Sequence, residues 1–298
     1  MGEFMNKIIV VNKPSGYTSH DVVNKIRKIF KTKRVGHTGT LDPDATGVLV
    51  VCLNEATKLV QFLEADSKEY IAEVLIGKST DTYDLSGNVI EEKEVENLTN
   101  QEVDEVLKRF TGKITQIPPI YSAIKVNGKK LYEYARNNQI VDLPKREVEI
   151  FELERLSDVS LIDGYYTFKL RCFVSKGTYI RSLCFDIASF LGYPGLMKSL
   201  LRTKSGAYSL SDAATLEEIE NGNFTSFDML GSLKNYDTID DEEFIYKASH
   251  GMKISINKVY EILNKKPNQI VIKNGDVLVG IYELDLNVNC YRAVRVWS

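Results

Sequence analysis

The spacing of apolar and polar residues along the chain predicts strands and helices in alternation. Residues 8–11 form an unbroken apolar run, which predicts a buried strand that ends before Pro14. Residues 18–30 open with Thr18 and Asp21 at capping-box spacing and then repeat apolar residues at the helical period, which predicts an amphipathic helix. The same patterns predict strands at residues 48–53, 69–77, 82–90 (after a turn), 146–156 and 164–177. They predict further helices at residues 56–63, 99–110 and 178–192.

Two segments depart from these patterns. Residues 116–138 have no clean period and contain two prolines, three tyrosines and four basic residues, so we expect an excursion from the core. Residues 236–244 (YDTIDDEEF) read as an acidic link, after which short strands separated by turns predict a small β-rich domain. Because strands and helices mix without regular βαβ alternation, the fold class is predicted as α+β. The predicted domains are residues 5–239 and 240–298.

The composition limits the number of domains and the cellular environment that we expect for the chain. The chain has 298 residues, of which 43% are hydrophobic, so it can bury the cores of two domains. Four cysteines stand in apolar stretches without CxxC pairs, which predicts buried thiols in a reducing, cytoplasmic environment. No apolar run approaches the roughly 20 residues of a membrane span, and no signal peptide is apparent. Residues 1–4 (MGEF) are interpreted as a cloning remnant before a natural start at Met5.

Charge is distributed unevenly. The net charge of −3 argues weakly against a nucleic-acid partner, but two segments are locally basic. Residues 25–34 contain six basic and no acidic residues, and residues 113–146 contain seven basic and two acidic ones. One such run would usually be a solvated face. Two of them, one leading into a glycine-rich loop, favour a surface that binds phosphates.

That loop, GHTGTLDPDATG at residues 36–47, holds the candidate chemistry. Pro43 keeps Asp42 out of the helical region, while the three glycines allow a close backbone approach. Asp42 could simply cap its own turn. A phosphate loop is disfavoured because the GK[ST] ending is missing, and a metal site because Asp42 and Asp44 point to opposite sides of an extended segment. The remaining interpretation is a single nucleophilic or acid–base aspartate.

Several motifs together resemble the TruB family of tRNA pseudouridine synthases. They are NKPSG, the glycine-rich loop, KEY, IPPIYSAIKVNGKKLYEYAR, SKGTYIR and GLMKSLLRTKSGAYSLSDA, in this order along nearly the whole chain. One departure is Asp44, at a position that is variable and often apolar in the family. The resemblance implies a mixed, largely antiparallel catalytic sheet at 5–239, with an RNA-binding insertion at about 116–146. It also implies a PUA-like RNA-binding domain at 240–298.

The resemblance implies a reaction as well. A uridine in the tRNA T-loop, at position 55, would leave the stack, lose its glycosidic bond, turn and rejoin the sugar through carbon. Neither a metal nor a cofactor is implied. Such a base must be extruded at a cost of a few kcal/mol, which protein aromatic and apolar groups offset by replacing the lost stacking.

Matched positions imply roles for individual residues. Asp42 would be the catalytic residue, Tyr70 would stack on the flipped base, and Arg181 would pair with Asp42 and keep it ionised. His37 would help to displace the target base. Lys13 and Tyr179 match family positions near the pocket, with Lys13 expected to orient the active-site loop.

Other functions stay open at this level. Guide-RNA-dependent dyskerin-type relatives share the aspartate loop but lack the basic insertion, so its presence favours a stand-alone monomer without an obligatory protein partner. A tRNA-binding or RNA-folding module would use the same basic segments but would not need Asp42, Tyr70 and Arg181 together. An aspartate-dependent glycosidase would need a second catalytic carboxylate, and none stands out in the sequence.

Overall fold

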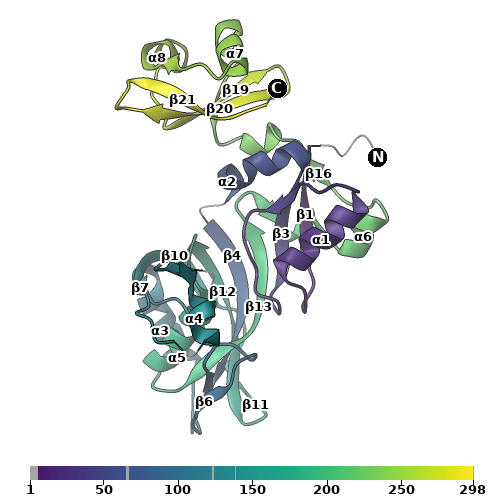
Figure 1. The fold of residues 1–298 in the computed structure, drawn as a ribbon. Helices are drawn as coiled ribbons and strands as arrows, with labels where there is room; N and C mark the ends of the chain where they lie inside the picture. Colours follow the sequence, from purple (N-terminus) through teal and green to yellow (C-terminus); the bar gives the residue numbers. More distant parts are fainter. Residues whose placement is uncertain (1–5, 65–66, 123, 138, 298) are drawn as a thin grey trace.

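The computed structural model describes residues 6–64, 67–122, 124–137 and 139–297, whose strands form a large sheet, a small five-stranded sheet and two two-stranded sheets (Figure 1). The small sheet lies at one end of the molecule, beyond the short helix α2 (Val60–Leu63). Residues 1–4, interpreted as a cloning remnant, lie outside the described residues, as do Ala123 and Asn138 of the predicted insertion.

Eight strands form the main path of the large sheet. In spatial order they are β15 (Ala213–Ala214), β1 (Ile8–Lys13), β3 (Thr46–Leu53), β13 (Gly195–Ser205), β4 (Ser67–Ile76), β12 (Tyr165–Ser175), β10 (Arg146–Arg155) and β7 (Gly112–Gln116). Along this path β1–β15 and β3–β13 pair in parallel, and the other neighbours pair antiparallel. The mixed, largely antiparallel sheet confirms the predicted α+β class.

Shorter strands and helices surround this sheet. The short strands are β2 (Val35–His37), β5 (Lys78–Thr80), β6 (Val89–Glu92), β8 (Lys125–Val126), β9 (Lys129–Lys130), β11 (Ser160–Ile162), β14 (Tyr208–Ser209) and β16 (Ser226–Phe227). The helices are α1 (Ser19–Ile29), α3 (Asn100–Phe110), α4 (Leu131–Arg136), α5 (Ile180–Phe190) and α6 (Leu216–Glu220), with 3-10 helices at Asn54–Leu59, Leu210–Asp212 and Gly231–Leu233.

The two predicted capping boxes are confirmed. Thr18 accepts a hydrogen bond from the Asp21 backbone, and the Asp21 side chain accepts one from the Thr18 backbone. Thr99 and Glu102 form the same arrangement at the start of α3. Each box satisfies backbone N–H groups that would otherwise lack partners at the first turn, which is why both helices begin where the sequence predicts.

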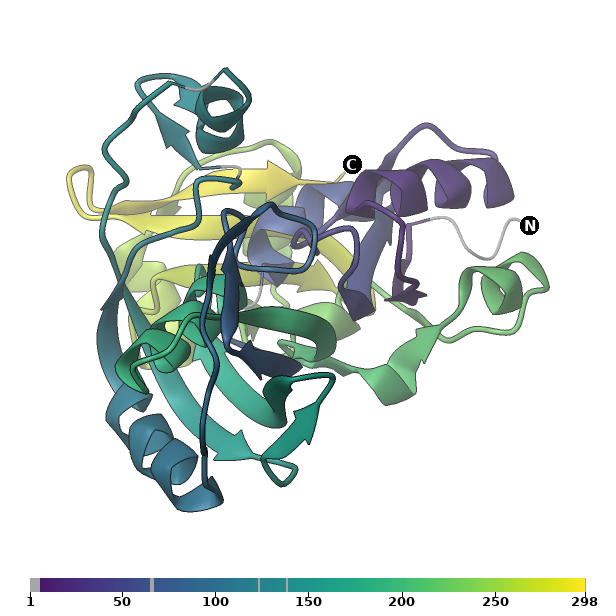
Figure 2. The ribbon, with the colours of Figure 1, turned by 90° about the horizontal axis from the view of Figure 1, so that it is seen from below.

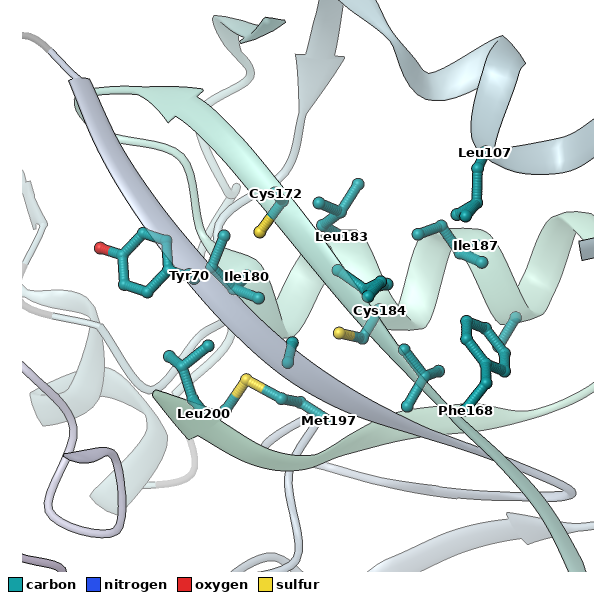
Figure 3. Close-up of a cluster of buried hydrophobic side chains, with 14 of the residues drawn as sticks. Tyr70, Leu107, Phe168, Cys172, Ile180, Leu183, Cys184, Ile187, Met197 and Leu200 are labelled. Atoms are coloured by element: carbon teal, nitrogen blue, oxygen red, sulfur yellow. The ribbon is translucent and has the colours of Figure 1, made fainter. Parts of the chain in front are cut away.

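The main core lies between the sheet and helices α3 and α5. Alternate residues of β4, among them Ala72, Val74 and Ile76, face the apolar side of α5. Figure 3 shows Leu183, Cys184 and Ile187 of α5 against this face, together with Phe168. Tyr70 belongs to the same cluster, but its hydroxyl points away from the labelled apolar side chains.

Strand β13 was not predicted from the sequence. Its residues GLMKSLLRTKS do not alternate, because the pairing with β4 shifts register between Met197 and Ser199 and again between Arg202 and Lys204. Bulges break the period-2 pattern on which strand prediction depends. The strand nevertheless joins β3 to β4, so it brings the aspartate loop next to Tyr70.

The small sheet is built from β17 (Asp237–Ile239), β19 (Gln269–Asn274), β20 (Val277–Asp285), β21 (Cys290–Val296) and β18 (Ile254–Ser255). Two helices, α7 (Glu242–Ser249) and α8 (Ile256–Leu263), accompany it. The predicted acidic link at 236–244 was therefore wrong. Its first part is β17, and its acidic residues begin α7, where Asp241 caps the helix and carboxylates favour the positive end of the helix dipole.

The predicted insertion forms the β8–β9 hairpin followed by α4. In the view of Figure 2 this segment lies on the same side of the molecule as α1, the helix that carries the first half of the basic run at residues 25–34. Leu131 is fully buried, and the Tyr134 hydroxyl donates to the Val126 carbonyl. These two contacts hold α4 against the β8–β9 hairpin and the rest of the molecule.

Candidate active site

The loop at residues 36–47 leads from β2 to β3, and the side chain of Lys13 hydrogen-bonds to its backbone at Pro43. This lysine is fully buried, and its Nζ donates to the carbonyls of Pro43 (2.7 Å), Pro14 (2.9 Å) and Tyr17 (2.5 Å). Burial is the main reason that its pKa is lowered to about 8. The bond to Pro43 lies one residue after Asp42, so Lys13 is placed where the predicted orienting role requires it.

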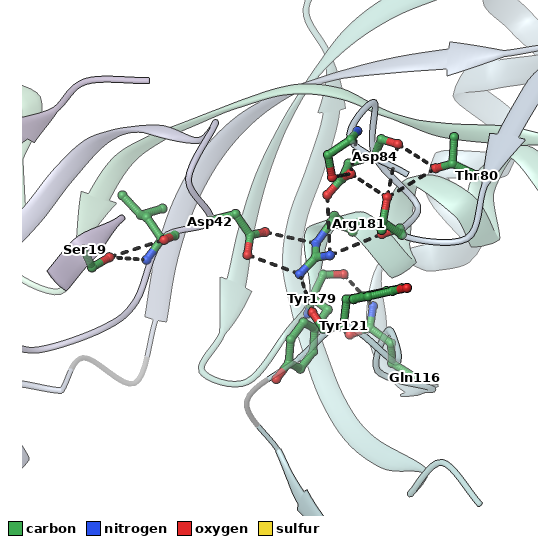
Figure 4. A network of polar contacts seen from close by, with 11 residues as sticks. Ser19, Asp42, Thr80, Asp84, Gln116, Tyr121, Tyr179 and Arg181 are labelled. Carbon is green, nitrogen blue, oxygen red and sulfur yellow. Dashed lines mark hydrogen bonds and ion pairs between the residues drawn. The ribbon is translucent and has the colours of Figure 1, made fainter. Parts of the chain in front are cut away.

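Asp42 forms a two-point contact with Arg181 (Figure 4). The Arg181 Nε atom lies 3.0 Å from Oδ2 of Asp42, and an Arg181 terminal nitrogen donates to Oδ1 at 3.2 Å. This geometry combines charge with a fixed orientation. The described hydrogen bonds of the carboxylate go to Arg181 rather than to its own turn, which argues against a simple turn-capping role.

Arg181 is held in place by other groups. It is 7% exposed, and it donates to the carbonyls of Thr82 (3.2 Å) and Tyr121 (3.1 Å). It also lies 3.4 Å from Oδ2 of Asp84, so a second carboxylate shares the same guanidinium. The opposite oxygen of Asp84 accepts hydrogen bonds from the Thr82 hydroxyl and from Ser86.

Two opposing effects act on the pKa of Asp42. Arg181 favours the charged form, as predicted, but burial is the larger effect and raises the pKa of Asp42 above its ordinary value. Asp84 adds to the rise because it repels a second negative charge. The Asp42 side chain still has 38% of its surface exposed, so the carboxylate is partly shielded from water but remains accessible from the solvent.

A cavity of about 450 Å³ opens beside this pair. Its lining includes Asp42, Arg181, Tyr70 and Tyr179 from the predicted set, together with Leu200 and Arg202 of β13. Burial raises the pKa of the Tyr70 hydroxyl, and the Arg202 charge partly opposes this rise. A larger cavity of about 580 Å³ lies between segment 228–238 and β19, and it contains none of the predicted site residues.

The remaining predicted residues lie in different positions. The Tyr179 backbone is clamped by Gln116, which accepts from its N–H at 2.8 Å and donates to its carbonyl at 3.0 Å. His37 ends β2 and is not among the residues that line the described cavity. Its Nδ1 accepts from the Gly39 N–H at 3.3 Å, and burial lowers its pKa.

Sequence reasoning missed Asp84, Arg202 and the pocket residues of the insertion. Asp84 was interpreted only as part of a turn, although the hydroxyl-rich run STDTYD marks a cluster of side chains able to fix a carboxylate. Ser122 and Tyr132 line the cavity from the insertion. The Ser122 hydroxyl is buried, and its proximity to the Tyr179 hydroxyl lowers the pKa of that tyrosine against the larger effect of burial.

Three further observations concern the cysteines, metal binding and membrane spans. The four cysteines are buried and unpaired, as the sequence predicts. In the part of the chain that the structure describes, no cluster of three or more His, Cys, Asp and Glu side chains could hold a metal ion. No helix in that part is long and apolar enough to cross a membrane.

Comparison with known proteins identifies this arrangement. Residues 27–180 match the N-terminal domain model of the TruB family pseudouridylate synthases, and residues 181–228 match the C-terminal domain model of tRNA pseudouridylate synthase B. The tRNA pseudouridine synthase B of Oceanobacillus iheyensis is 42% identical over 99% of this chain and 98% of its own. The enzyme of that name from Bacillus cereus is 44% identical over 94% and 92%.

Solved structures agree on the fold. A chain in the crystal structure of a Cbf5-Nop10-Gar1 complex superimposes with a TM-score of 0.71 at 25% identity, covering 99% of this chain and 84% of that one. A chain of the archaeal box H/ACA sRNP Nop10-Cbf5 complex gives 0.67 at 24% identity. From the family models and the full-length relatives together, we conclude that the chain belongs to the TruB family and is a tRNA pseudouridine synthase.

Proposed function

We propose that the enzyme converts uridine 55 in the T-loop of tRNA to pseudouridine, with Asp42 as the catalytic residue. The observation that carries this proposal is the Asp42–Arg181 contact at the wall of a cavity that also contains Tyr70. A binding module would not need a carboxylate with a raised pKa held by a buried arginine.

The reaction must break the N1–C1′ bond of uridine and form a C5–C1′ bond. The hydrogen at C5 leaves as a proton and N1 gains one, so the product has the same mass as the substrate. Asp42 supplies the ionised oxygen that attacks the nucleotide or takes a proton from it. Because other groups hold Arg181, the carboxylate keeps its direction while the base turns.

The flipped base needs a surface to replace its lost stacking. Tyr70 provides an aromatic face at the cavity, and Leu200 provides an apolar one. Tyr179 adds a second ring, and Gln116 fixes the Tyr179 backbone through two hydrogen bonds. His37 lies at the base of the aspartate loop, so displacement of the target base by His37 would require RNA to approach from that side.

We further propose a stand-alone enzyme that acts in the cytoplasm as a monomer. The basic insertion supports binding of the T-stem-loop without a guide RNA, because the β8–β9 hairpin, whose residues include its lysines, lies on the same side of the molecule as α1 in Figure 2. The C-terminal domain at about 240–298 is proposed as a PUA-like RNA-binding domain. Its sheet begins at Asp237, three residues before the sequence-based boundary.

The experiment is direct conversion of a T-stem-loop RNA by the purified protein alone. Pseudouridine is detected by a chemical label that reacts with it and not with uridine. We expect complete conversion of the uridine at position 55 and none of the other loop uridines. A loop with cytidine at that position serves as the control. Binding of the RNA without conversion would instead support the RNA-folding module, and conversion only after a guide RNA is added would support a guide-dependent enzyme.

A further inference from the structure

Arg202 is an unusual buried arginine. It is 1% exposed and comes from β13, yet it takes part in none of the ion pairs that the structure describes. Buried arginines are normally paired with a carboxylate, because an unpaired charge is costly to remove from water. Its charge must therefore be stabilised in another way.

The partners of Arg202 are backbone carbonyls on both arms of the aspartate loop. Its Nε donates to the Val48 carbonyl at 2.7 Å, and its two terminal nitrogens donate to Gly39 at 3.1 Å and Thr40 at 3.4 Å. Gly39 and Thr40 precede Asp42, and Val48 follows it. One rigid guanidinium thus links the segment that enters the loop to the segment that leaves it.

The backbone of Arg202 makes a second connection to the same loop. Strand β13 pairs in parallel with β3 at Gly47, which has a φ of +101°. A Cβ atom at Gly47 would lie 2.3 Å from the Arg202 carbonyl oxygen, so only glycine fits there. On its other side, Arg202 is directly opposite Tyr70 of β4, and its side chain also interacts with the Tyr70 hydroxyl, which lowers the pKa of that hydroxyl against the larger effect of burial.

We propose that Arg202 is a positioning residue for pseudouridine formation, which holds the loop that carries Asp42 at a fixed distance from the strand that carries Tyr70. A loop with three glycines would otherwise sample many conformations. Arg202 has no described contact with the Asp42 carboxylate, so it acts through the backbone of the loop and through Tyr70 rather than on Asp42 itself. The proposal rests on the proposed role of Asp42, which conversion by Asp42→Asn tests separately.

The test compares Arg202→Met, Arg202→Lys and a matched control, Arg171→Met. Arg171 is also on the large sheet, but it contacts Glu69, Glu152 and Glu154 and does not line the cavity. Single-turnover conversion, affinity for the T-stem-loop and melting temperature are measured for each variant. Hydrogen–deuterium exchange of residues 36–48 reports on the loop itself.

For Arg202→Met we expect the single-turnover rate to fall about 100-fold while RNA affinity stays within about threefold, because a displacement near 1 Å can have such an effect. Arg202→Lys keeps the positive charge but loses the planar guanidinium that donates to several carbonyls. Its single-turnover rate should therefore lie between that of the parent and that of Arg202→Met. Faster exchange should be confined to the loop. Arg171→Met should lower the melting temperature and leave the rate of the folded protein within about threefold.

Two results would overturn the proposal. The first is a folded Arg202→Met that converts RNA near the parental rate or, if that variant does not fold, a folded Arg202→Lys that does so. The second is a loss of rate that follows the melting temperature equally in the Arg202 and Arg171 variants. That result would make Arg202 a structural residue of the sheet.

Discussion

At the residue scale, the active site is defined by one guanidinium between two carboxylates. Arg181 contacts Asp42 and Asp84, so it cannot fully neutralise either of them. Asp84 is also satisfied by Thr82 and Ser86, whereas the described hydrogen bonds of Asp42 go to Arg181 alone. Asp42 is therefore the less stabilised carboxylate, and it is the one at the cavity wall.

Asp42→Asn should abolish conversion without unfolding the protein. The amide preserves the shape of the side chain and can still accept a hydrogen bond from Arg181, but it is neither charged nor nucleophilic. If Asp42 only capped its turn, the change would lower stability by ~0.5–2 kcal/mol and leave activity largely intact. The measurements are single-turnover conversion, the melting curve and tRNA affinity, which should stay within a few fold.

Asp44→Asn is the matched control, two residues along the same loop. Asp44 is exposed and does not line the cavity, so this variant should keep most of its activity. An active Asp42→Asn together with an inactive Asp44→Asn would show that the wrong carboxylate was assigned. If both variants are active, neither Asp42 nor Asp44 is the catalytic residue.

The sequence alone could predict Asp42 because its neighbours restrict it locally: Pro43 limits its backbone, and glycines surround it. Arg181 is 139 residues away, and only the resemblance to a family connected the two. The hydroxyl-rich run around Asp84 indicates a held carboxylate but not its partner, and Arg202 had no signal in the sequence. Their roles depend on tertiary contacts with Arg181 and with backbone carbonyls, which no local pattern encodes.

At the element scale, the insertion supplies charge and aromatic rings to the edge of the cavity. The Nζ of Lys129 lies 5.9 Å from the ring centre of Tyr134, and that of Lys130 lies 5.4 Å from the ring centre of Tyr132. Tyr132 lines the cavity, while Lys129 is exposed. An RNA loop that enters the cavity would pass over these lysines, where phosphates and cations attract each other.

Replacing Lys129 and Lys130 together by alanine should weaken RNA binding and reduce its dependence on salt. Each lost phosphate contact lowers the slope of log affinity against log salt by about 0.7–0.9. The slope should therefore fall by up to ~1.8 for the double variant. Helix α4 should persist, because the Lys130 backbone still donates to Glu133. Binding of the T-stem-loop is measured between low and high salt.

The control is a double alanine variant at Lys108 of α3 and Lys169 of β12. Both lysines are exposed and neither lines the cavity, so their removal changes the net charge equally without touching the proposed RNA path. Equal slopes for the two double variants would mean that the insertion is only a solvated surface.

Regular elements were predictable because their patterns are local. Strand β1 and helices α1 and α3 follow from an apolar run or a capped helical period. Strand β13 was missed since two bulges interrupt its alternation, and α7 was missed since its acidic first turn resembles a linker. The bulged strand carries Leu200 and Arg202 to the wall of the cavity, so an element that the sequence pattern did not predict helps to form the site.

At the scale of the whole molecule, the C-terminal domain is joined to the catalytic domain by a shared apolar cluster. Val271, Leu278 and Trp297 of the small sheet region pack with residues of β1 and β3. The Trp297 indole donates to the Glu55 carbonyl at 3.3 Å, and Lys58 donates to the Val296 carbonyl at 3.2 Å. Deleting the domain would expose this cluster, so a point variant gives a cleaner test of its role.

Trp297→Ala should separate binding of full-length tRNA from chemistry. The described residues that line the active-site cavity end at Arg202, so the C-terminal domain adds no group to the reaction. Trp297 is 9% exposed, and loss of a buried tryptophan removes about 3–5 kcal/mol of packing, here at the contact between the domains. We expect a lower melting temperature, weaker binding of full-length tRNA, and conversion of a minimal T-stem-loop within about threefold of the parent.

Met252→Ala, at an exposed methionine outside the cluster, is the control and should change none of these values. If folded Trp297→Ala loses conversion of both RNAs equally, the position of the domain affects the active site. If its binding of full-length tRNA is unchanged, the domain is not part of the RNA-binding surface.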